Sequence, residues 1–332
     1  MKSYIIAEAG VNHNGRLDLA LQLCDAAKEA GADAVKFQTW KTENIVTASA
    51  CQAAYQTENT GVAESQFDML KKLELSYEDF RYIQNHCHRI GIDFLSTPDE
   101  EESLAFLVSL GLPFIKVGSG EVTNIPYLRR IGACHKDVIL STGMSDLSDV
   151  ELAYETLLKA GAKNVALLHC TTNYPCPMDE VNLRAMITLR DRFKCKVGYS
   201  DHTVGTEVDV AAVALGAEII EKHFTLDRSM EGPDHKASLE PSEFKLMVQQ
   251  IRNIEAALGD GVKRPNRSEA ENAKVVQKSI LARRPIKRGE VLTEDVLVSK
   301  RAGSGISSRY WDDVVGTKAI KDFEIDEPIV LS

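Results

Sequence analysis

The stretch GADAVK, residues 31–36, contains the pattern that decides the fold: a glycine, a short connection and then an apolar run. A glycine just past a helix end adopts the left-handed conformation that terminates the helix. A short apolar run after it is typical of a buried parallel strand. The same pattern recurs at four further places, which read GIDFLS at 91–96, GLPFIK at 111–116, GAKNVA at 161–166 and GAEIIE at 216–221.

The segments before these glycines have helical periodicity. Ala20, Cys24 and Ala27 recur at the spacing of one helix face before the first glycine. The string SYED at 76–79 resembles a capping box, which predicts the start of the helix before the second glycine. The chain therefore alternates helices with buried strands.

Eight such strands are predicted within residues 1–258, and eight strand–helix units of this length suit an α/β fold of the (β/α)8 TIM-barrel type. A doubly wound sheet is the alternative, but no GxGxxG string follows the first strand. The polar, irregular residues 40–72 are predicted to run over the mouth of the barrel. The predicted strands are residues 3–8, 34–39, 93–97, 114–118, 137–142, 165–170, 196–200 and 218–224.

The character of the chain changes after the predicted barrel. Residues 259–278 are polar and charged, which predicts a linker. Residues 279–332 contain short strand-like runs between turn signals, and we expect a small β-rich domain there. A module of this size buries little surface alone, so it is expected to lean on the barrel or on a partner subunit.

Bulk properties narrow the class of protein. A net charge of −10 over 332 residues argues against non-specific nucleic-acid binding. No apolar run approaches the length of a membrane span, and the N-terminus lacks the features of a signal peptide. The seven cysteines form no CxxC pair. We therefore expect a cytoplasmic protein with reduced thiols and with no nucleic-acid or membrane partner.

Polar residues recur where the predicted strands end, which is the end of a TIM barrel that holds the active site. Two lysines, Lys36 and Lys116, lie inside apolar strands, so each needs a carboxylate partner or an anionic ligand. The internal alternative pairs them with Glu8 or Glu121. A small, multiply charged anion is the ligand that such lysines and hydroxyls favour. The strand-end residues are Glu8, Lys36, Ser96, Thr97, Lys116, Ser119, Glu121, Ser141, Thr142, His169, Thr172, Tyr174, Ser200, Asp201, His202, Glu221, Lys222 and His223.

Two of the eight histidines, His202 and His223, end neighbouring strands and could meet in the barrel mouth. Two imidazoles with open positions suit a divalent metal such as Mn²⁺. The alternative is that His223 only hydrogen-bonds a carboxylate. His13, together with His86, His88 and His135, is predicted to lie in turns or on helix surfaces.

Nine strings, in order along the predicted barrel, resemble the sialic-acid synthase family. A C-terminal string, KRAGSG at 300–305, resembles the family's antifreeze-like domain, also called the SAF or β-clip domain. The resemblance implies a TIM barrel followed by this small domain. It also implies an enzyme that condenses phosphoenolpyruvate with an N-acylated mannosamine-type sugar. The nine strings are IIAEAGVNHNG, AVKFQTW, FLSTP, IKVGSGE, ILSTGM, LLHCTTNYP, GYSDHT, IEKHFT and GPDHKASLEP.

The resemblance also implies roles for individual residues. It makes His202 and His223 the ligands of Mn²⁺, or of another divalent cation such as Mg²⁺ or Co²⁺. It places Arg301 over the sugar of a second subunit, in a domain-swapped homodimer. The residues implied to hold phosphoenolpyruvate are Lys36, Thr97, Lys116, Ser119 and Ser200. Those implied around the sugar and the proton transfers are Glu8, Glu121, Tyr174, Glu221 and Asp234, with Glu8, Glu121 and Glu221 as the catalytic carboxylates.

Two positions depart from the N-acetylneuraminate-making members. Thr172 stands where those members often have Asn near the phosphate, and Phe37 stands where they commonly have His. The combination of strings is more similar to the branch that makes N,N'-diacetyllegionaminate from 2,4-diacetamido-2,4,6-trideoxymannose. N-acetylneuraminate synthesis from N-acetylmannosamine is the alternative, and pseudaminate synthesis is a third.

Two different classes of protein remain open. A Schiff base on Lys116 or Lys222 would make the chain an aldolase of the pyruvate type. The small domain alone would suit a carbohydrate- or ice-binding protein without catalysis. A binding module has no need of polar residues at nearly every strand end, which disfavours that reading.

Overall fold

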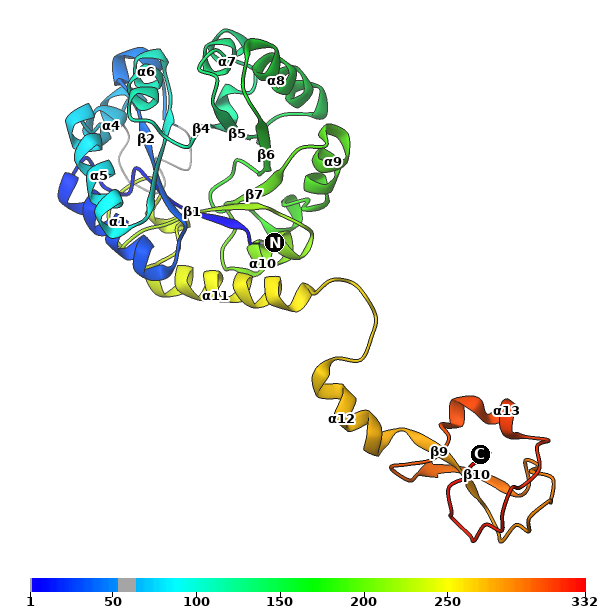
Figure 1. Cartoon of the computed structure of the whole chain (residues 1–332). Helices are drawn as coiled ribbons and strands as arrows, with labels where there is room; N and C mark the ends of the chain where they lie inside the picture. The colour runs from blue at the N-terminus through cyan, green and yellow to red at the C-terminus, as the bar shows by residue number, and fades with distance from the viewer. Residues whose placement is uncertain (1, 53–63) are drawn as a thin grey trace. The chain divides into compact units, whose positions relative to one another are not determined.

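Eight parallel strands form one sheet in the computed structural model, which describes residues 2–52 and 64–332. The strand order is β3-β2-β1-β8-β7-β6-β5-β4, and β3 and β4 at its two ends are also neighbours in space. The sheet therefore closes into the predicted TIM barrel (Figure 1). The strands are β1 Tyr4–Gly10, β2 Ala34–Thr39, β3 Asp93–Pro98, β4 Phe114–Val117, β5 Asp137–Ser141, β6 Val165–His169, β7 Val197–Asp201 and β8 Ile219–His223.

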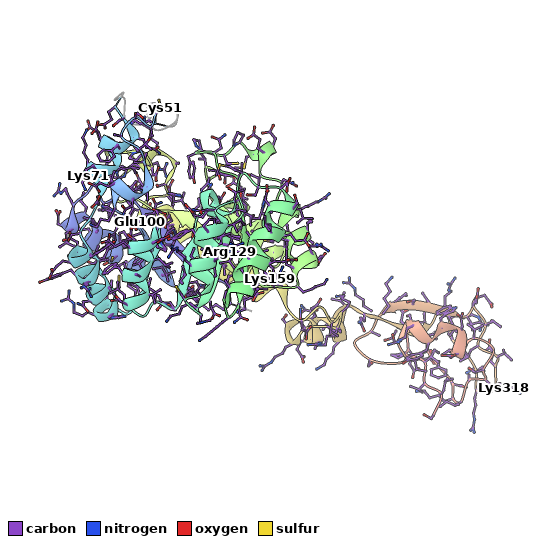
Figure 2. All side chains as sticks on the ribbon, turned by 90° about the horizontal axis from the view of Figure 1, so that it is seen from above. Cys51, Lys71, Glu100, Arg129, Lys159 and Lys318 are labelled. Atoms are coloured by element: carbon purple, nitrogen blue, oxygen red, sulfur yellow. The ribbon has the colours of Figure 1, made fainter. Side chains whose placement is uncertain are left out.

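Helices surround these strands, and their ends carry the predicted signals. Gly31 and Gly91 lie in the left-handed region at the ends of α1 and α5, with φ of 90° and 72°. Ser76 and Asp79 form the predicted capping box of α5. Exposed charges such as Lys71 and Lys159 cover the outside (Figure 2). The helices of this unit are α1 Leu17–Ala30, α2 Thr42–Ile45, α4 Gln66–Leu73, α5 Tyr77–Ile90, α6 Glu101–Ser109, α7 Ile125–Gly132, α8 Leu147–Ala160, α9 Arg184–Phe193, α10 Glu207–Ala214 and α11 Pro241–Leu258.

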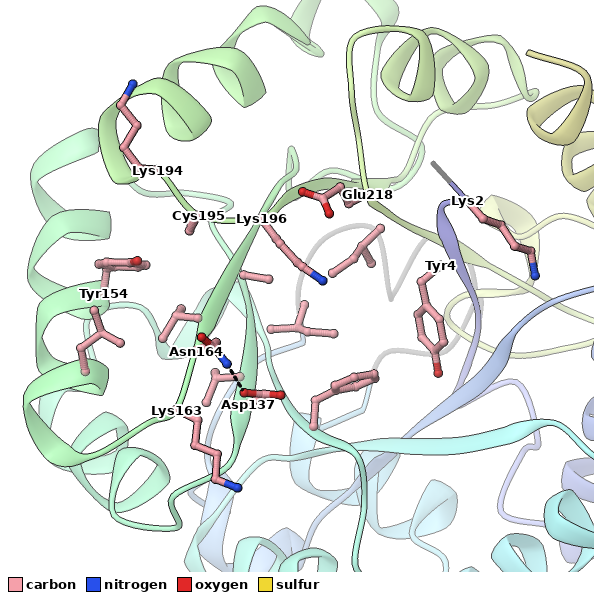
Figure 3. A pocket seen from close by; sticks show the side chains of 17 residues that line it. Lys2, Tyr4, Asp137, Tyr154, Lys163, Asn164, Lys194, Cys195, Lys196 and Glu218 are labelled. Atoms are coloured by element: carbon pink, nitrogen blue, oxygen red, sulfur yellow. Dashed lines mark hydrogen bonds between the residues drawn. The ribbon is translucent and has the colours of Figure 1, made fainter. Parts of the chain in front are cut away.

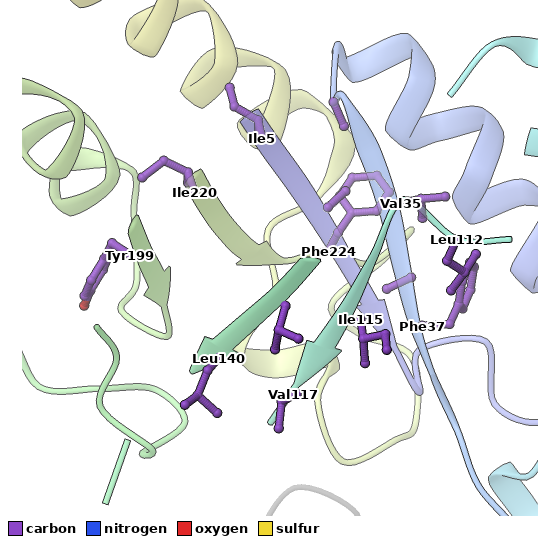
Figure 4. Close-up of a cluster of buried hydrophobic side chains, with 14 of the residues drawn as sticks. Ile5, Val35, Phe37, Leu112, Ile115, Val117, Leu140, Tyr199, Ile220 and Phe224 are labelled. Atoms are coloured by element: carbon purple, nitrogen blue, oxygen red, sulfur yellow. The ribbon is translucent and has the colours of Figure 1, made fainter. Parts of the chain in front are cut away.

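Successive residues of each strand face opposite sides of the sheet, which gives the barrel two apolar layers. Ile5 and Phe37 belong to the outer layer, between strands and helices (Figure 4). Phe37 stacks on Phe94 there, with ring centroids 6.1 Å apart. The inner layer fills the barrel axis and consists of Ile6, Ala34, Leu95, Ile139, Ala166, Leu168 and Ile219.

The excursion predicted between residues 40 and 72 contains two short helices, α2 and α4. Trp40 packs with Met69 and Leu73 in a small buried cluster. The Glu74 carboxylate accepts hydrogen bonds from the backbone and side chain of Thr42, at 3.1 and 2.9 Å. Residues 53–63 of the predicted excursion lie outside the described residues.

A second compact unit spans Asp260–Ser332. Helix α12, Arg267–Val276, lies in the stretch predicted as a linker, and none of its residues is buried. Strands β9 Lys278–Ala282 and β10 Leu297–Arg301 pair antiparallel, and a short helix α13, Trp311–Val314, follows. The unit has its own apolar core, which includes Ile280, Ile286, Leu292, Leu297, Phe323 and Ile329. Among the described residues, no helix combines the length and apolarity that crossing a membrane requires.

Candidate active site at the carboxyl ends of the strands

Most of the predicted site residues line one cavity of about 150 Å³ at the carboxyl ends of the barrel strands. Each strand contributes the residues of its inward face, two positions apart, above the inner apolar layer. The predicted residues that line this cavity are Glu8, Lys36, Thr97, Lys116, Ser119, Ser141, Tyr174, Ser200, His202, Glu221 and His223.

The two buried lysines of this cavity pair with carboxylates. The Lys36 ammonium lies 2.6 Å from Glu8 Oε2 and 3.8 Å from Glu221 Oε2. It also donates to the Thr97 hydroxyl at 3.2 Å. The Lys116 ammonium lies 3.4 Å from Glu221 Oε1 and donates to Ser141 at 2.8 Å. The internal pairing considered for Lys36 is therefore present, whereas Lys116 pairs with Glu221 instead of Glu121.

The two carboxylates of this network have opposite pKa shifts. Burial raises the pKa of Glu8 to about 7, although Lys36 opposes the shift. Burial alone would also raise the pKa of Glu221, but Lys116 and Lys36 together lower it to about 2. Burial lowers the pKa of Lys116. Carboxyl groups whose environments separate their pKa values in this way are suited to different roles in proton transfer.

A group of small donors lies beside the lysines. The Gly143 amide donates to the Ser119 hydroxyl at 3.0 Å, and the same hydroxyl lies 3.2 Å from Cys170 Sγ. Position 143 has no room for a side chain, because a Cβ there would lie 2.2 Å from Thr172 Oγ1. Ser200 donates to Glu221 at 3.0 Å. At this edge of the cavity, the hydroxyls of Ser119 and Ser200 and the backbone at Gly143 can approach an anionic group closely.

The two strand-end histidines meet as predicted, with ring centroids 5.4 Å apart. His202 Nδ1 donates to the Thr171 carbonyl at 2.6 Å, which leaves Nε2 as the acceptor nitrogen. His223 Nδ1 is buried and has no hydrogen-bond partner among the described residues. The structure therefore does not show the alternative, in which His223 only hydrogen-bonds a carboxylate.

The donor set fits a divalent cation. Burial lowers the pKa of His202 and, with His202 beside it, takes that of His223 well below its usual value. Both rings are therefore neutral near pH 7, the state in which imidazole binds metals. A metal bound by one nitrogen of each ring lies about 2.1 Å from both nitrogens, so the two ring centres are then at most about 6.5 Å apart. The centres of His202 and His223 are 5.4 Å apart, within that limit. Within residues 2–52 and 64–332, no three His, Cys, Asp or Glu residues form a metal-holding group, so further ligands would come from substrate or water.

Four of the residues that the family resemblance points to lie outside this cavity. Glu121 ends the short helix after β4 and accepts a hydrogen bond from Asn124 at 2.6 Å. Thr172 lines a neighbouring cavity of about 700 Å³, and its buried hydroxyl has no partner among the described residues. Asp234 is buried close to Gly10, where a Cβ would lie 3.8 Å from its carboxylate. Arg301 is exposed at the end of β10, in the second unit.

Three cavity residues were missed from the sequence: Gln38, Asp99 and Cys170. Each lies two positions after a residue of the inward face, so strand alternation would have found them. Gln38 and Cys170 fall within predicted strands, and Asp99 lies two residues past the end of one. Burial raises the pKa of Asp99 to about 7. His169 was selected by the strand-end rule but contacts the Val181 carbonyl at 2.7 Å, outside the cavity.

His13 lies in the turn after β1, one of the two places predicted for it, but it is fully buried there and packs beside Phe37. Lys222, one of two lysines considered for a Schiff base, is fully buried on the outward face of β8 and does not line the cavity. An outward residue of a strand points to the surrounding helices, where substrate does not reach.

A larger cavity of about 840 Å³ lies at the opposite, amino-terminal end of the barrel. Its floor includes Tyr4, Phe114 and Ile219, and lysines such as Lys196 lie around it (Figure 3). It contains no predicted site residue. TIM-barrel enzymes place their chemistry at the carboxyl ends of the strands, so the smaller cavity is the candidate active site.

Several family models, known proteins and solved structures are similar to this chain. The model of the NeuB family matches residues 23–263, and that of the SAF domain matches residues 277–332. The N,N'-diacetyllegionaminic acid synthase of Campylobacter jejuni is 50% identical over 330 residues, 99% of each chain. The enzyme of the same name from Legionella pneumophila is 46% identical over 96% of this chain and 90% of its own. The crystal structure of N-acetylneuraminic acid synthetase from Leptospira borgpetersenii, with citrate, superposes with a TM-score of 0.72 at 34% identity, covering 82% of this chain and 91% of that one.

Proposed function

The chain belongs to the NeuB family, and from this membership we propose that it condenses phosphoenolpyruvate with an N-acylated aminosugar to give a nine-carbon acid and phosphate. The observation that carries the proposal is the pair of buried lysines beside two neutral histidines in one small cavity. Such a site suits a multiply charged anion next to a polarised carbonyl group.

The lysines and hydroxyls would hold phosphoenolpyruvate by charge and hydrogen bonds, without a covalent step. Lys36 and Lys116 would neutralise its phosphate and carboxylate. Thr97, Ser119 and Ser200 would donate hydrogen bonds from the rim of the same cavity. In the free protein, Glu8 and Glu221 already balance these ammonium groups, so the anion enters a site whose charges are in place.

Carbon–carbon bond formation joins C3 of phosphoenolpyruvate to the aldehyde carbon of the open-chain sugar. The aldehyde oxygen gains a proton, and the attacking water loses one as it adds at C2. The C2–O bond to the phosphate group then breaks, and the new C2 hydroxyl loses its proton to form the ketone. The two protons lost by water balance the one gained by the aldehyde oxygen and the one taken up by phosphate. Among the carboxylates, we propose that Glu8 accepts the proton of that water, because its raised pKa makes it the stronger base. Glu221 remains ionised and balances the lysines and the positive charge that develops at C2.

We propose that His202 and His223 hold the divalent cation, with Mn²⁺ as the expected ion. When bound, such a cation supplies Lewis-acid polarisation of a carbonyl oxygen. The hydrogen bond from His202 Nδ1 to the Thr171 carbonyl fixes the tautomer that leaves Nε2 free to ligate. Tyr174 packs against His202 at an interplanar angle of 39°, with centroids 4.1 Å apart, which limits rotation of that ring.

The sugar that we propose is 2,4-diacetamido-2,4,6-trideoxymannose, which would make the product N,N'-diacetyllegionaminate. The support is the 50% and 46% identity to relatives named for that acid, together with the motif combination in this chain. N-acetylmannosamine, which would give N-acetylneuraminate, is the alternative substrate.

We also propose that the active enzyme is a homodimer in which Arg301 of one copy reaches the sugar of the other. The family resemblance suggests the exchange, and two properties of this residue support it. Arg301 is exposed at the end of β10, and it has no ion pair within the described part of the chain. A free guanidinium is suited to a planar amide or carboxylate of a ligand.

A substrate panel tests the proposal. Phosphate release from phosphoenolpyruvate would be followed with each sugar separately, in the presence of Mn²⁺ and after chelation. We expect turnover with the 2,4-diacetamido sugar that exceeds turnover with N-acetylmannosamine by tenfold or more. Preference for N-acetylmannosamine would overturn the assignment to the N,N'-diacetyllegionaminate branch. A covalent adduct trapped by borohydride, with full activity after chelation, would overturn the reaction class.

A further inference from the structure

Lys222 forms a fully buried ionic cluster behind the active site. Its ammonium pairs with the Asp201 carboxylate, donates to the Thr203 carbonyl at 2.7 Å and lies 3.7 Å from Asp209. Lys222, Asp201 and Asp209 are all 0% exposed. None of them lines the catalytic cavity, so substrate does not explain why three ionisable groups are buried here.

The cluster joins the two strands that carry the histidines. Asp201 and Lys222 are direct partners in the β7–β8 pairing. His202 follows Asp201 in the chain, and His223 follows Lys222. Since successive residues face opposite sides of the strand, Lys222 points outward to Asp209 of α10 while His223 points into the cavity.

The cluster also holds the turn that contains His202. The Thr203 amide and hydroxyl donate to the two oxygens of Asp201, at 2.9 and 3.0 Å. Lys222 binds the same carboxylate and the Thr203 carbonyl. The backbone on both sides of His202 is therefore tied to the strand end of His223, and the His202 carbonyl also accepts from the Cys176 amide at 2.8 Å.

We propose that Lys222, Asp201 and Asp209 are positioning residues that set the separation of His202 and His223 for a shared cation. This inference rests on the proposed metal site. Buried ion pairs contribute little net stability, because desolvation offsets their attraction, and apolar replacements often serve as well. Hydrogen bonds have direction and apolar contacts do not. Apolar residues in place of this cluster could therefore not fix the geometry between β7 and β8, the strands that carry the two histidines.

The test measures Mn²⁺ affinity directly, by the electron paramagnetic resonance signal of free Mn²⁺, in the full-length protein without substrate. The variants are Lys222→Met, which removes the ammonium, and Thr203→Val, which removes only the hydroxyl bond to Asp201. Arg252→Met is the matched control, because Arg252 ties Asp33 and Glu255 together in an ion-pair network that does not contact the histidines. Thermal unfolding is recorded for every variant.

We expect the Mn²⁺ dissociation constant to rise about tenfold or more in Lys222→Met. Thr203→Val should show a smaller rise and fold even if Lys222→Met does not. Arg252→Met should lower the unfolding temperature without changing the dissociation constant. Unchanged Mn²⁺ affinity in Thr203→Val and in folded Lys222→Met would overturn the positioning role. Failure of the parent protein to bind Mn²⁺, or binding that survives His202→Ala, would instead overturn the metal site itself.

Discussion

Lys36 Nζ lies 2.6 Å from Glu8 Oε2, and both side chains are almost completely buried between neighbouring strands β1 and β2. A pair of this kind costs desolvation energy that its attraction barely repays, so it is a poor device for stability alone. Its position in the barrel mouth gives it another use. Glu8 keeps the ammonium charged and in place until an anionic substrate arrives.

Replacement of Lys36 by methionine, Lys36→Met, should reduce kcat/KM for phosphoenolpyruvate by about 100-fold or more, because charge-assisted hydrogen bonds to the substrate are lost. Steady-state phosphate release measures the effect. Lys159→Met is the control, because that lysine is exposed on α8 and, among the described residues, pairs only with Glu155. A Lys36→Met enzyme within threefold of the parent value would show that this lysine does not bind the substrate.

Asp99 should make phosphoenolpyruvate binding depend on pH. Burial raises the pKa of Asp99 to about 7, so the group is mostly neutral below that pH and ionised above it. Ionisation adds negative charge near Lys36 and repels the anionic substrate. The KM for phosphoenolpyruvate should therefore rise severalfold from pH 6.5 to 8. Glu8, whose pKa is also about 7, ionises over the same range, so Asp99→Asn should reduce that rise without removing it. The same profile in both proteins would assign the pH dependence to another group.

Removal of the divalent cation should abolish activity, and added Mn²⁺ should restore it. His202→Ala and His223→Ala should each weaken Mn²⁺ binding by at least about 100-fold, since each removes one of two protein ligands. Calorimetric titration with Mn²⁺ checks both, with His86→Ala as the control, because His86 pairs with Asp25 at the side of the barrel. Full activity in metal-free protein would contradict the proposed site.

Mixed dimers can test the proposed exchange of Arg301. His202→Ala subunits lack a working barrel site but keep Arg301, whereas Arg301→Ala subunits have the reverse defect. If the arginine acts across the dimer, random mixing restores one intact site in each heterodimer, or about a quarter of the parent activity. If it acts within its own chain, unfolding and refolding the mixture should restore none.

The barrel could be predicted because its signals are local. Glycines such as Gly31 and Gly161 terminate helices through a backbone conformation that other residues rarely adopt. The apolar strands that follow have no other place than the interior. Helix α12 was missed although Asn266 and Glu269 form a capping box at its start, because its polar, charged sequence buries no residue.

The sequence predicted residues that line the cavity where polar side chains on the inward face of a strand follow an apolar run. His202 and His223 lie on the inward face and were found, and so were the lysines. The partner of Lys116 was not, because strand-end position does not tell which of several carboxylates, such as Glu121 or Glu221, reaches it. Burial of His13 likewise depends on contacts between distant segments, which composition does not report.

The apolar side chains that fill the barrel axis separate the catalytic cavity from the larger hollow at the other end. Ile139 belongs to the wall of the lower hollow, and Ser141, two residues further along β5, belongs to the upper one. Water and ions in the lower hollow would have to cross this apolar layer to reach the reacting carbons, and charged species do so at a high cost in desolvation energy. A short-lived cationic intermediate would therefore meet solvent only from the side where the chain places its own acids and bases.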